Sequence, residues 1–249
     1  MLFRQARRRR ILARHSIPDA LWNETFAQLT SLARLDADER QRLRELAVIF
    51  LHEKAIEPAL GFQLEDTMRV RIAALACRPI LALGLDCYDD VRSVIVHPDE
   101  FVVRGREEVD AAGVVHVSDD VLSGEAWEQG PVILAWQEVL ASGRGDGFDV
   151  VAHEFAHKLD LLDGDANGTP PLHRGMSREA WAQAFQWAYD DLCARVERGE
   201  DTWLDPYAAD DPSEFFAVCT ELYFDVPERL KIEYPAVFSQ LTAFYHPGR

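Results

Sequence analysis

One short apolar segment constrains this chain more than any other feature of its sequence. In residues 150–160, apolar side chains surround His153, Glu154 and His157. A segment this apolar is expected to form a buried helix, and buried polar side chains need partners. Histidines four residues apart lie on one helix face, roughly 6 Å apart, so both imidazoles can reach one metal ion. The segment predicts a metal-binding helix. The alternative is a core helix whose histidines only form hydrogen bonds with their neighbours.

The order His-Glu-x-x-His also places an acid beside the expected metal. Glu154 projects about 100° around the helix from His153, which suits a base that holds a water molecule better than a third ligand. Zinc suits imidazole and lowers the pKa of a bound water to about 7, so that a carboxylate can deprotonate it. The pattern indicates zinc-dependent hydrolysis. Iron(II) is the alternative metal, because two histidines and a carboxylate also form its facial ligand set.

A catalytic zinc needs a third protein ligand and one open position. No histidine follows His157 at the metzincin spacing, and the other histidines lie in separate segments. Glu214 is favoured, because it begins a predicted helix among phenylalanines, where burying a carboxylate is costly unless a cation accepts it. Glu221, on the same face, and Asp160 or Asp163 stay open as alternatives. Asp160 is also placed to hydrogen-bond a ligand imidazole or to form an outward salt bridge.

Periodicity divides the chain into helical and extended parts. Apolar residues at helical spacing predict N-terminal helices over residues 18–32, 38–50 (capped by Asp36) and 66–77. Short β-branched runs predict strands over residues 80–85, 91–97, 101–103, 114–117 and 132–136. Helical spacing returns over residues 149–162, 177–198, 212–224 and 234–245. The expected fold class is α+β, with a helical N-terminal part, a small mixed β-sheet and a helical C-terminal part carrying the zincin-like metal site.

No composition shift marks a linker, so residues 16–249 are expected to form one domain with two lobes. The strand at 132–136 is either an ordinary core strand or an exposed edge to which an extended peptide adds. The loop at 163–171 follows the metal helix directly and is expected to form a rim of the cleft.

Charge is distributed unevenly along the chain. Residues 1–14 hold six arginines and no acid, which leaves 20 basic and 43 acidic residues, a formal charge of −23, in the remainder. An acidic body repels phosphate backbones, so direct nucleic-acid binding is not expected. Residues 1–15 are expected to be a flexible basic segment lying against this body, with contact to anionic lipid or RNA as the alternative.

The sequence favours a cytoplasmic monomer. No run of about 18 apolar residues is present, so neither a transmembrane helix nor a membrane partner is expected. The basic start lacks the apolar stretch of a signal peptide. Widely spaced cysteines without a CxxC pair favour reduced thiols. They are Cys77, Cys87, Cys193 and Cys219.

Further motifs accompany the histidine pair and carry a specific resemblance. They are ACRPILALGLDCYDD (76–90), VHPDEFVV (96–103), SGEAWEQGPVILAW (123–136), HEFAHKLD (153–160), DPYAADDPSEFFAV (205–218) and ELYF (221–224). From about residue 25 to residue 245, the chain resembles the Mlc titration factor A family of glucose-regulated metallopeptidases. The catalytic core of that family is similar to that of the anthrax lethal factor protease.

This resemblance implies a site and an activity. It places the zinc ligands on His153, His157 and Glu214. It assigns Glu154 as the general base and Tyr207 as the group that stabilises the transition state; an oxyanion in peptide hydrolysis needs a donor besides zinc. It also implies aminopeptidase-like action on short peptides and binding to a glucose-related transcriptional repressor, which would be sequestered from DNA. The alternative function is a binding protein that titrates a regulator and keeps the metal site as a vestige or a structural element.

Overall fold

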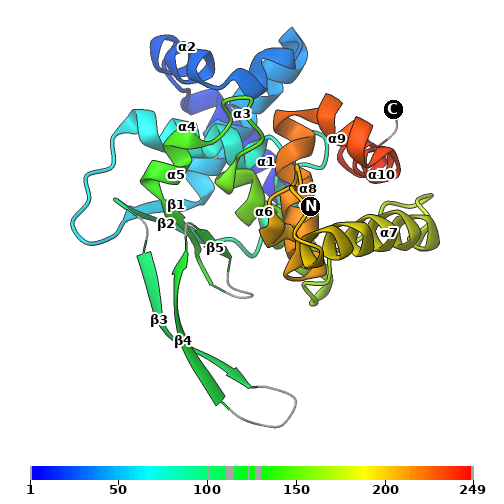
Figure 1. The fold of residues 1–249 in the computed structure, drawn as a ribbon. Helices are drawn as coiled ribbons and strands as arrows, with labels where there is room; N and C mark the ends of the chain where they lie inside the picture. The colour runs from blue at the N-terminus through cyan, green and yellow to red at the C-terminus, as the bar shows by residue number, and fades with distance from the viewer. Residues whose placement is uncertain (1, 100, 110–114, 123, 127–129, 248–249) are drawn as a thin grey trace.

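In the computed structural model, the helices lie above and beside a small sheet, and a two-stranded ribbon projects away from them (Figure 1). The structure describes residues 2–99, 101–109, 115–122, 124–126 and 130–247. The N-terminal helices are α1 (Leu2–Arg14), α2 (Asp19–Gln28), α3 (Ala37–Glu53) and α4 (Asp66–Cys77), with short 3-10 helices η1 (Thr30–Arg34) and η2 (Leu85–Tyr88). The predictions for 38–50 and 66–77 are confirmed. The predicted helix 18–32 is divided at Leu29, where α2 has ended and η1 follows.

Local capping explains where α3 starts. The Asp36 carboxylate accepts a hydrogen bond from the backbone N–H of Glu39 at 2.9 Å, and the Glu39 carboxylate accepts from the backbone N–H of Asp36 at 3.1 Å. This reciprocal capping box satisfies N–H groups that the first turn of a helix leaves without partners. The predicted role of Asp36 as a cap is confirmed.

The main sheet is small and mixed, as expected. Its strand order is β1 (Ala55–Pro58), β2 (Ser93–His97), β6 (Val132–Ala135) and β5 (Gly124–Ala126). Strands β1, β2 and β6 are parallel, whereas β5 runs antiparallel to β6. The projecting ribbon pairs β3 (Phe101–Val109) with β4 (Val115–Leu122) in antiparallel register. The predicted strands 101–103 and 114–117 fall on this ribbon, except that Val114 lies outside the described residues.

Strand β6 is internal, which decides between its two interpretations. It pairs with β2 on one side and β5 on the other, and Val132, Leu134 and Ala135 are buried. The alternative of an exposed substrate edge at 132–136 is therefore wrong, and the core-strand alternative is confirmed. On this side of β6 the edge strand is β5, which pairs on its other side with no strand of the described chain.

Residues 80–85 do not form the predicted strand. After α4 the chain continues through tight turns, in which the N–H of Leu81 donates to the Arg78 carbonyl at 3.2 Å and the N–H of Gly84 donates to the Ile80 carbonyl at 2.7 Å. Ile80 and Leu81 are buried, so these apolar side chains contribute to the core without any strand pairing. An apolar run alone does not distinguish the two cases.

The C-terminal part is helical. It contains α5 (Trp136–Ala141), α6 (Val150–Asp160), α7 (Arg178–Glu197), α8 (Pro212–Asp225), α9 (Pro227–Glu233) and α10 (Pro235–Tyr245), with η3 (Leu161–Asp163) and η4 (Pro206–Ala209). Helices α6, α7, α8 and α10 confirm the predicted C-terminal helices to within two residues. Proline begins α8, α9 and α10, because the first helical position needs no N–H donor.

Aromatic packing holds α6 in the centre of the molecule. The ring of Phe155 is buried, with its centroid 4.6 Å from that of Tyr88 and 5.7 Å from that of Phe50. Helix α8 lies beside α6 (Figure 1) and buries Phe215 and Phe216 in the same hydrophobic core. Helices α6 and α8 are therefore fixed by the core itself. The division of the domain into two lobes stays a prediction.

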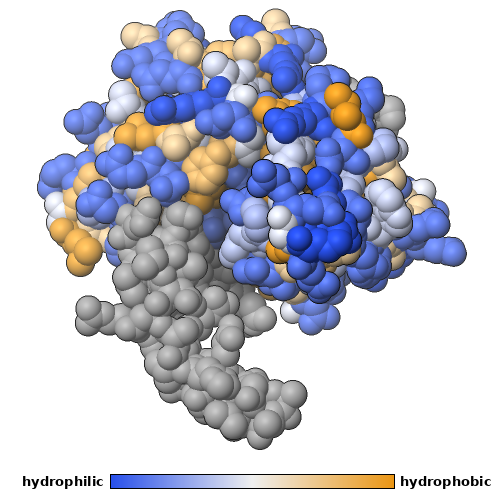
Figure 2. Space-filling model, viewed as in Figure 1, coloured by the Kyte–Doolittle hydropathy of each residue, from blue (hydrophilic) through white to orange (hydrophobic). Residues whose placement is uncertain are grey.

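The surface offers no simple apolar interface on the visible face. Figure 2 shows hydrophilic residues predominating there, with apolar residues scattered among them. Among the described helices, none combines the length and the apolarity required to span a membrane. All four cysteines are free thiols, as predicted.

The basic N-terminal segment forms a docked helix, and the flexibility expected of residues 1–15 stays a prediction. Residues 2–14 form α1, and Ile11 is buried against the body. Ile11 shares one helix face with Arg4 and Arg8, at spacings of seven and three residues, so that face has both an apolar anchor and two cations.

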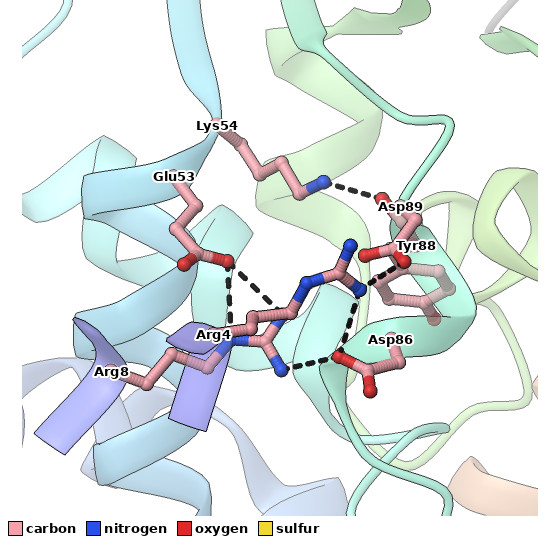
Figure 3. A network of polar contacts seen from close by, with 7 residues as sticks. All are labelled: Arg4, Arg8, Glu53, Lys54, Asp86, Tyr88 and Asp89. Atoms are coloured by element: carbon pink, nitrogen blue, oxygen red, sulfur yellow. Dashed lines mark hydrogen bonds and ion pairs between the residues drawn. The ribbon is translucent and has the colours of Figure 1, made fainter. Parts of the chain in front are cut away.

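Two arginines of α1 form ion pairs with acidic side chains of the body (Figure 3). Arg8 pairs with Glu53 of α3 at 3.1 Å and with Asp86 of η2 at 2.6 Å. Arg4 pairs with Asp86 and with Asp89. The expectation that the basic segment lies against the acidic body is confirmed, in the form of specific ion pairs.

Candidate metal centre

A cap and a buried core place the two histidines on α6. The Asp149 carboxylate precedes the helix and accepts a hydrogen bond from the backbone N–H of Ala152 at 3.0 Å. One turn then separates His153 from His157, and their ring centroids lie 4.8 Å apart. Their Nε2 atoms are 3.2 Å apart, so both nitrogens point to the same place.

The third group comes from the first turn of α8. Asp211 caps this helix by accepting hydrogen bonds from the backbone N–H groups of Ser213 at 2.7 Å and Glu214 at 3.1 Å. Glu214 Oε2 lies 3.0 Å from His153 Nε2 and 3.5 Å from His157 Nε2. Ligand-type atoms of these three residues all lie within 4.8 Å of one another. The structure thus brings together the predicted ligands His153, His157 and Glu214.

The donor set fits a divalent cation. Glu214 Oε2 is buried and makes no hydrogen bond of acceptable geometry, although two imidazole nitrogens face it. A buried polar atom in this state is costly, and a cation between the three groups would satisfy it. Two imidazole nitrogens and one carboxylate oxygen are ligands of the kind that zinc takes in catalytic sites, with one position left open.

Electrostatics at the site favour positive charge. Burial lowers the pKa of His153, but Glu214 and Glu221 raise it by more, and the net pKa lies well above the ordinary value. Burial raises the pKa of Glu214, but the two imidazoles lower it by more, so this carboxyl is ionised far below its usual range. In the metal-free protein a proton on His153 therefore balances the carboxylates, and a metal ion competes with that proton.

Glu221 lies on the other side of the His153 ring. Its Oε1 is 2.8 Å from His153 Nδ1, and its Oε2 accepts a hydrogen bond from the backbone N–H of Asp149 at 2.7 Å. The carboxylate is therefore directed away from the three converging groups, and the alternative of Glu221 as the third ligand is wrong. The sequence signal for its actual position is the seven-residue spacing from Glu214, which puts both acids on one face of α8.

Glu154 and Tyr207 both lie near the converging groups. Glu154 is buried on α6, and its charge contributes to the raised pKa of His153 and of Tyr207. The Tyr207 ring centroid is 6.3 Å from that of His153, and the residue is 45% exposed, so it borders both the site and solvent. Burial and the charge of Glu214 raise the pKa of the Tyr207 phenol, which keeps its proton available for donation at neutral pH.

Two contacts hold Tyr207 in place. The carboxylate of Asp205 accepts a hydrogen bond from the backbone N–H of Tyr207 at 3.0 Å. The hydroxyl of Tyr189, on α7, donates to the Ala209 carbonyl at 3.0 Å. Together they fix both ends of η4, the short helix that carries the phenol.

Asp160 has a structural role that differs from all three of its predicted ones, namely a metal ligand, a partner of a ligand imidazole and an outward salt bridge. It is fully buried, and its Oδ2 accepts a hydrogen bond from the backbone N–H of Gly168 at 2.7 Å. Gly168 has φ +76°, and a Cβ there would lie 2.4 Å from the Pro212 carbonyl oxygen. The loop at 163–171 thus packs against the start of α8 and ties it to the end of α6, and it does not place Asp160 or Asp163 among the ligands.

Comparisons with known proteins identify the family of this chain. The sequence model of the family described as "glucose-regulated metallo-peptidase M90" matches residues 3–246 of this chain. Mlc titration factor A of Enterobacter sp. (strain 638) is 40% identical over 235 residues, covering 92% of this chain and 87% of the relative. The protein of the same name from Serratia proteamaculans (strain 568) is 39% identical over 230 residues, covering 91% and 86%. Because both comparisons extend over nearly the whole chain, including α6 and α8, the chain belongs to the glucose-regulated metallo-peptidase M90 family.

Proposed function

We propose that this chain is a zinc-dependent peptidase with aminopeptidase-like action on short peptides. Membership of a metallopeptidase family implies a divalent metal. The observation that carries the proposal is the convergence of His153, His157 and Glu214 on one point between α6 and α8. We further propose a monomeric, cytoplasmic protein in which residues 16–249 form one domain with two lobes.

Each group of the site has a distinct task in the proposed reaction. Zinc held by the two histidines and Glu214 would polarise the peptide carbonyl and make water acidic enough to attack it. Glu154 accepts the proton of the attacking water and delivers it to the leaving amine. Tyr207 donates a hydrogen bond to the oxygen of the former carbonyl as negative charge develops there. The raised pKa of this phenol supports the last assignment, because only the protonated form can donate.

The substrate would lie along β5. This strand contacts α6 and occupies the edge of the sheet. An extended peptide can add to such an edge through main-chain hydrogen bonds. The proposed peptide therefore runs beside the metal helix with its backbone held by β5.

A second function comes from the relatives. Their shared name, Mlc titration factor A, refers to titration of Mlc, and we propose that this chain likewise binds a transcriptional repressor. The acidic body could compete with DNA for a basic DNA-binding face. The competing function remains a titrating protein whose metal site is vestigial or structural.

The Glu154→Gln variant separates these functions. The purified full chain is loaded with one equivalent of zinc and assayed on short peptides, with Glu228→Gln, an exposed glutamate on α9, as the matched control. We expect Glu154→Gln to lose cleavage while it retains zinc and repressor binding, and Glu228→Gln to match the wild type. Absence of cleavage by the zinc-loaded wild type would contradict the enzyme and favour the titrating protein. Iron without zinc in protein purified with no added metal would contradict the choice of metal.

A further inference from the structure

Three carboxylates form one stripe along α8. Glu214, Glu221 and Asp225 are separated by seven and four residues, which places them within about 40° of one another around the helix axis. They meet successive parts of the segment before and within α6. Glu214 faces the paired imidazoles, Glu221 meets His153 and the backbone of Asp149, and Asp225 accepts from Gly147 N–H at 2.6 Å and Gly145 N–H at 3.0 Å.

Of these three carboxylates, Glu221 contacts Nδ1 of His153, the ring nitrogen opposite the one that faces the proposed metal. The backbone N–H of Asp149 can only donate, so Glu221 Oε2 is an acceptor. Its Oε1, at 2.8 Å, likewise requires a proton on His153 Nδ1. The neutral imidazole that carries its proton on Nδ1 has its lone pair on Nε2, the nitrogen that faces Glu214 and His157.

We propose that Glu221 is a positioning residue that selects the tautomer of His153 competent to bind the metal and ties this ring to the start of α6. The inference rests on the proposed metal site. All three partners are buried, since Glu221 is 6%, His153 9% and Asp149 0% exposed, so water does not readily replace the carboxylate. Carboxylates that accept from the second nitrogen of a ligand histidine fix its orientation and raise its basicity, and their loss weakens metal binding by about 10–100-fold.

The chain offers a matched pair of isosteric variants. In Glu221→Gln, the amide oxygen can still accept from Asp149 N–H, but the amide NH₂ then faces His153 Nδ1 and donates to it. That contact favours the tautomer with a proton on Nε2, where the metal would bind. Asp225→Asn removes one charge from the same stripe, one turn further along, and likewise keeps one acceptor for backbone N–H groups without contacting His153.

The test measures the zinc dissociation constant of the full chain by competition with a chromophoric chelator, with folding checked by circular dichroism. We expect zinc binding about 10–100-fold weaker in Glu221→Gln and within about twofold of the wild type in Asp225→Asn. Wild-type affinity in a folded Glu221→Gln, or equal losses in both variants, would overturn the inference. A wild-type chain that binds no zinc would instead overturn the proposed metal site and this inference with it.

A second measurement needs no variant and decides the matter if Glu221→Gln fails to fold. Nitrogen NMR of the zinc-loaded wild-type chain, labelled at histidine, reports which ring nitrogen of His153 carries the proton. We expect an Nδ1–H that exchanges slowly with water and a metal on Nε2. A metal on Nδ1 of His153 would overturn the inference.

Discussion

Two charge clusters in this molecule join side chains distant in sequence, and they differ in whether their buried carboxylate oxygens have hydrogen-bond partners. At the interface of α6 and α8, the side chains of His153, His157 and Glu214 are 11%, 12% and 16% exposed. At the docked N-terminal helix (Figure 3), the side chains of Arg4 and Asp86 are 47% and 52% exposed, whereas those of Arg8 and Glu53 are 16% and 12% exposed. Both clusters contain carboxylates within ion-pair distance of basic groups, yet among the described acids of the two clusters only Glu214 has a buried oxygen without a hydrogen-bond partner.

The buried Glu214 oxygen without a hydrogen-bond partner therefore indicates which cluster would be completed by a metal ion. Solvent screens surface ion pairs, which typically contribute less than about 1 kcal/mol each. Taking a carboxylate out of water costs several kcal/mol unless a cation and good geometry compensate. The arginines of α1 fasten a helix to the body, whereas the imidazoles and Glu214 could hold a divalent cation, as proposed above. The predictions below probe this difference from its largest expected effect to its smallest.

The largest effect is expected from Glu214→Gln. The amide keeps the shape of the side chain but removes the anionic ligand, so zinc affinity should fall about 1000-fold, or about 4 kcal/mol. Chelator competition measures this change directly. Asp86→Asn, which removes an exposed acid from the cluster at α1, is the control and should leave zinc affinity unchanged. A Glu214→Gln affinity within tenfold of the wild type would show that burial of this carboxylate does not make it a ligand.

Asp160→Asn should stabilise the metal-free protein at high pH. Burial raises the pKa of Asp160 to about 6 from its ordinary value of 3.8. A raised pKa means that the folded state loses stability as the pH rises from about 4 through 6, by about 3 kcal/mol in total. The asparagine has no charge and can still accept from Gly168 N–H.

Denaturant unfolding with a chelator present checks this. The variant should gain up to about 3 kcal/mol at pH 8, and nothing at pH 4. Asp163→Asn, three residues away and partly exposed in an ion pair with Arg178, should change little at either pH. An equal gain at pH 4 and pH 8 would contradict the assignment to ionisation of Asp160.

Tyr207→Phe should lower kcat and leave the zinc affinity unchanged. Loss of one oxyanion donor is expected to lower kcat about 10–100-fold, at the mild end of such losses because zinc also stabilises the charge. Zinc affinity should stay within about twofold, because the phenol is not among the converging ligand atoms. Unchanged kcat would remove Tyr207 from the mechanism, and a matched loss of zinc would make it part of the metal site.

The smallest effect is expected at α1. Arg8→Ala removes the pairs to Glu53 and Asp86 and should cost about 1 kcal/mol of unfolding free energy in dilute buffer. Salt at 1 M, where screening acts within about 3 Å, should remove the contribution of the pair to Asp86, which is 52% exposed, and reduce less the contribution of the pair to Glu53, which is 12% exposed. Arg10→Ala is the control, since Arg10 is exposed and has no ion pair among the described residues. A salt-independent loss for Arg8→Ala would mean that packing, and not charge, holds the helix.

Chemistry carried by a local pattern is predictable from this sequence. The four-residue spacing of His153 and His157 within an apolar segment predicts their shared helix face, and Asp211-Pro212 predicts the start of α8 that places Glu214 in its first turn. The helices follow from periodicity and caps because each depends on residues close in sequence.

Features that depend on the arrangement of distant segments are not predictable in the same way. Glu221 has the composition and spacing of a ligand, and only the packing of α8 on α6 shows that it contacts His153 from the opposite side. The apolar run at 80–85 is as consistent with a buried turn as with a strand. Strand β1 escapes prediction because it is short, ends in Pro58 and has only Ile56 buried. The arginine-rich start forms a docked helix because Arg8 forms ion pairs with Glu53 and Asp86, which lie far along the chain.

The most direct test of the account is a crystal structure of the zinc-loaded chain with anomalous scattering data at the zinc edge. The account predicts one anomalous peak between α6 and α8, within about 2.3 Å of Nε2 of His153, Nε2 of His157 and a carboxylate oxygen of Glu214. A peak elsewhere, or a Glu214 side chain turned away from the paired imidazoles, would contradict it.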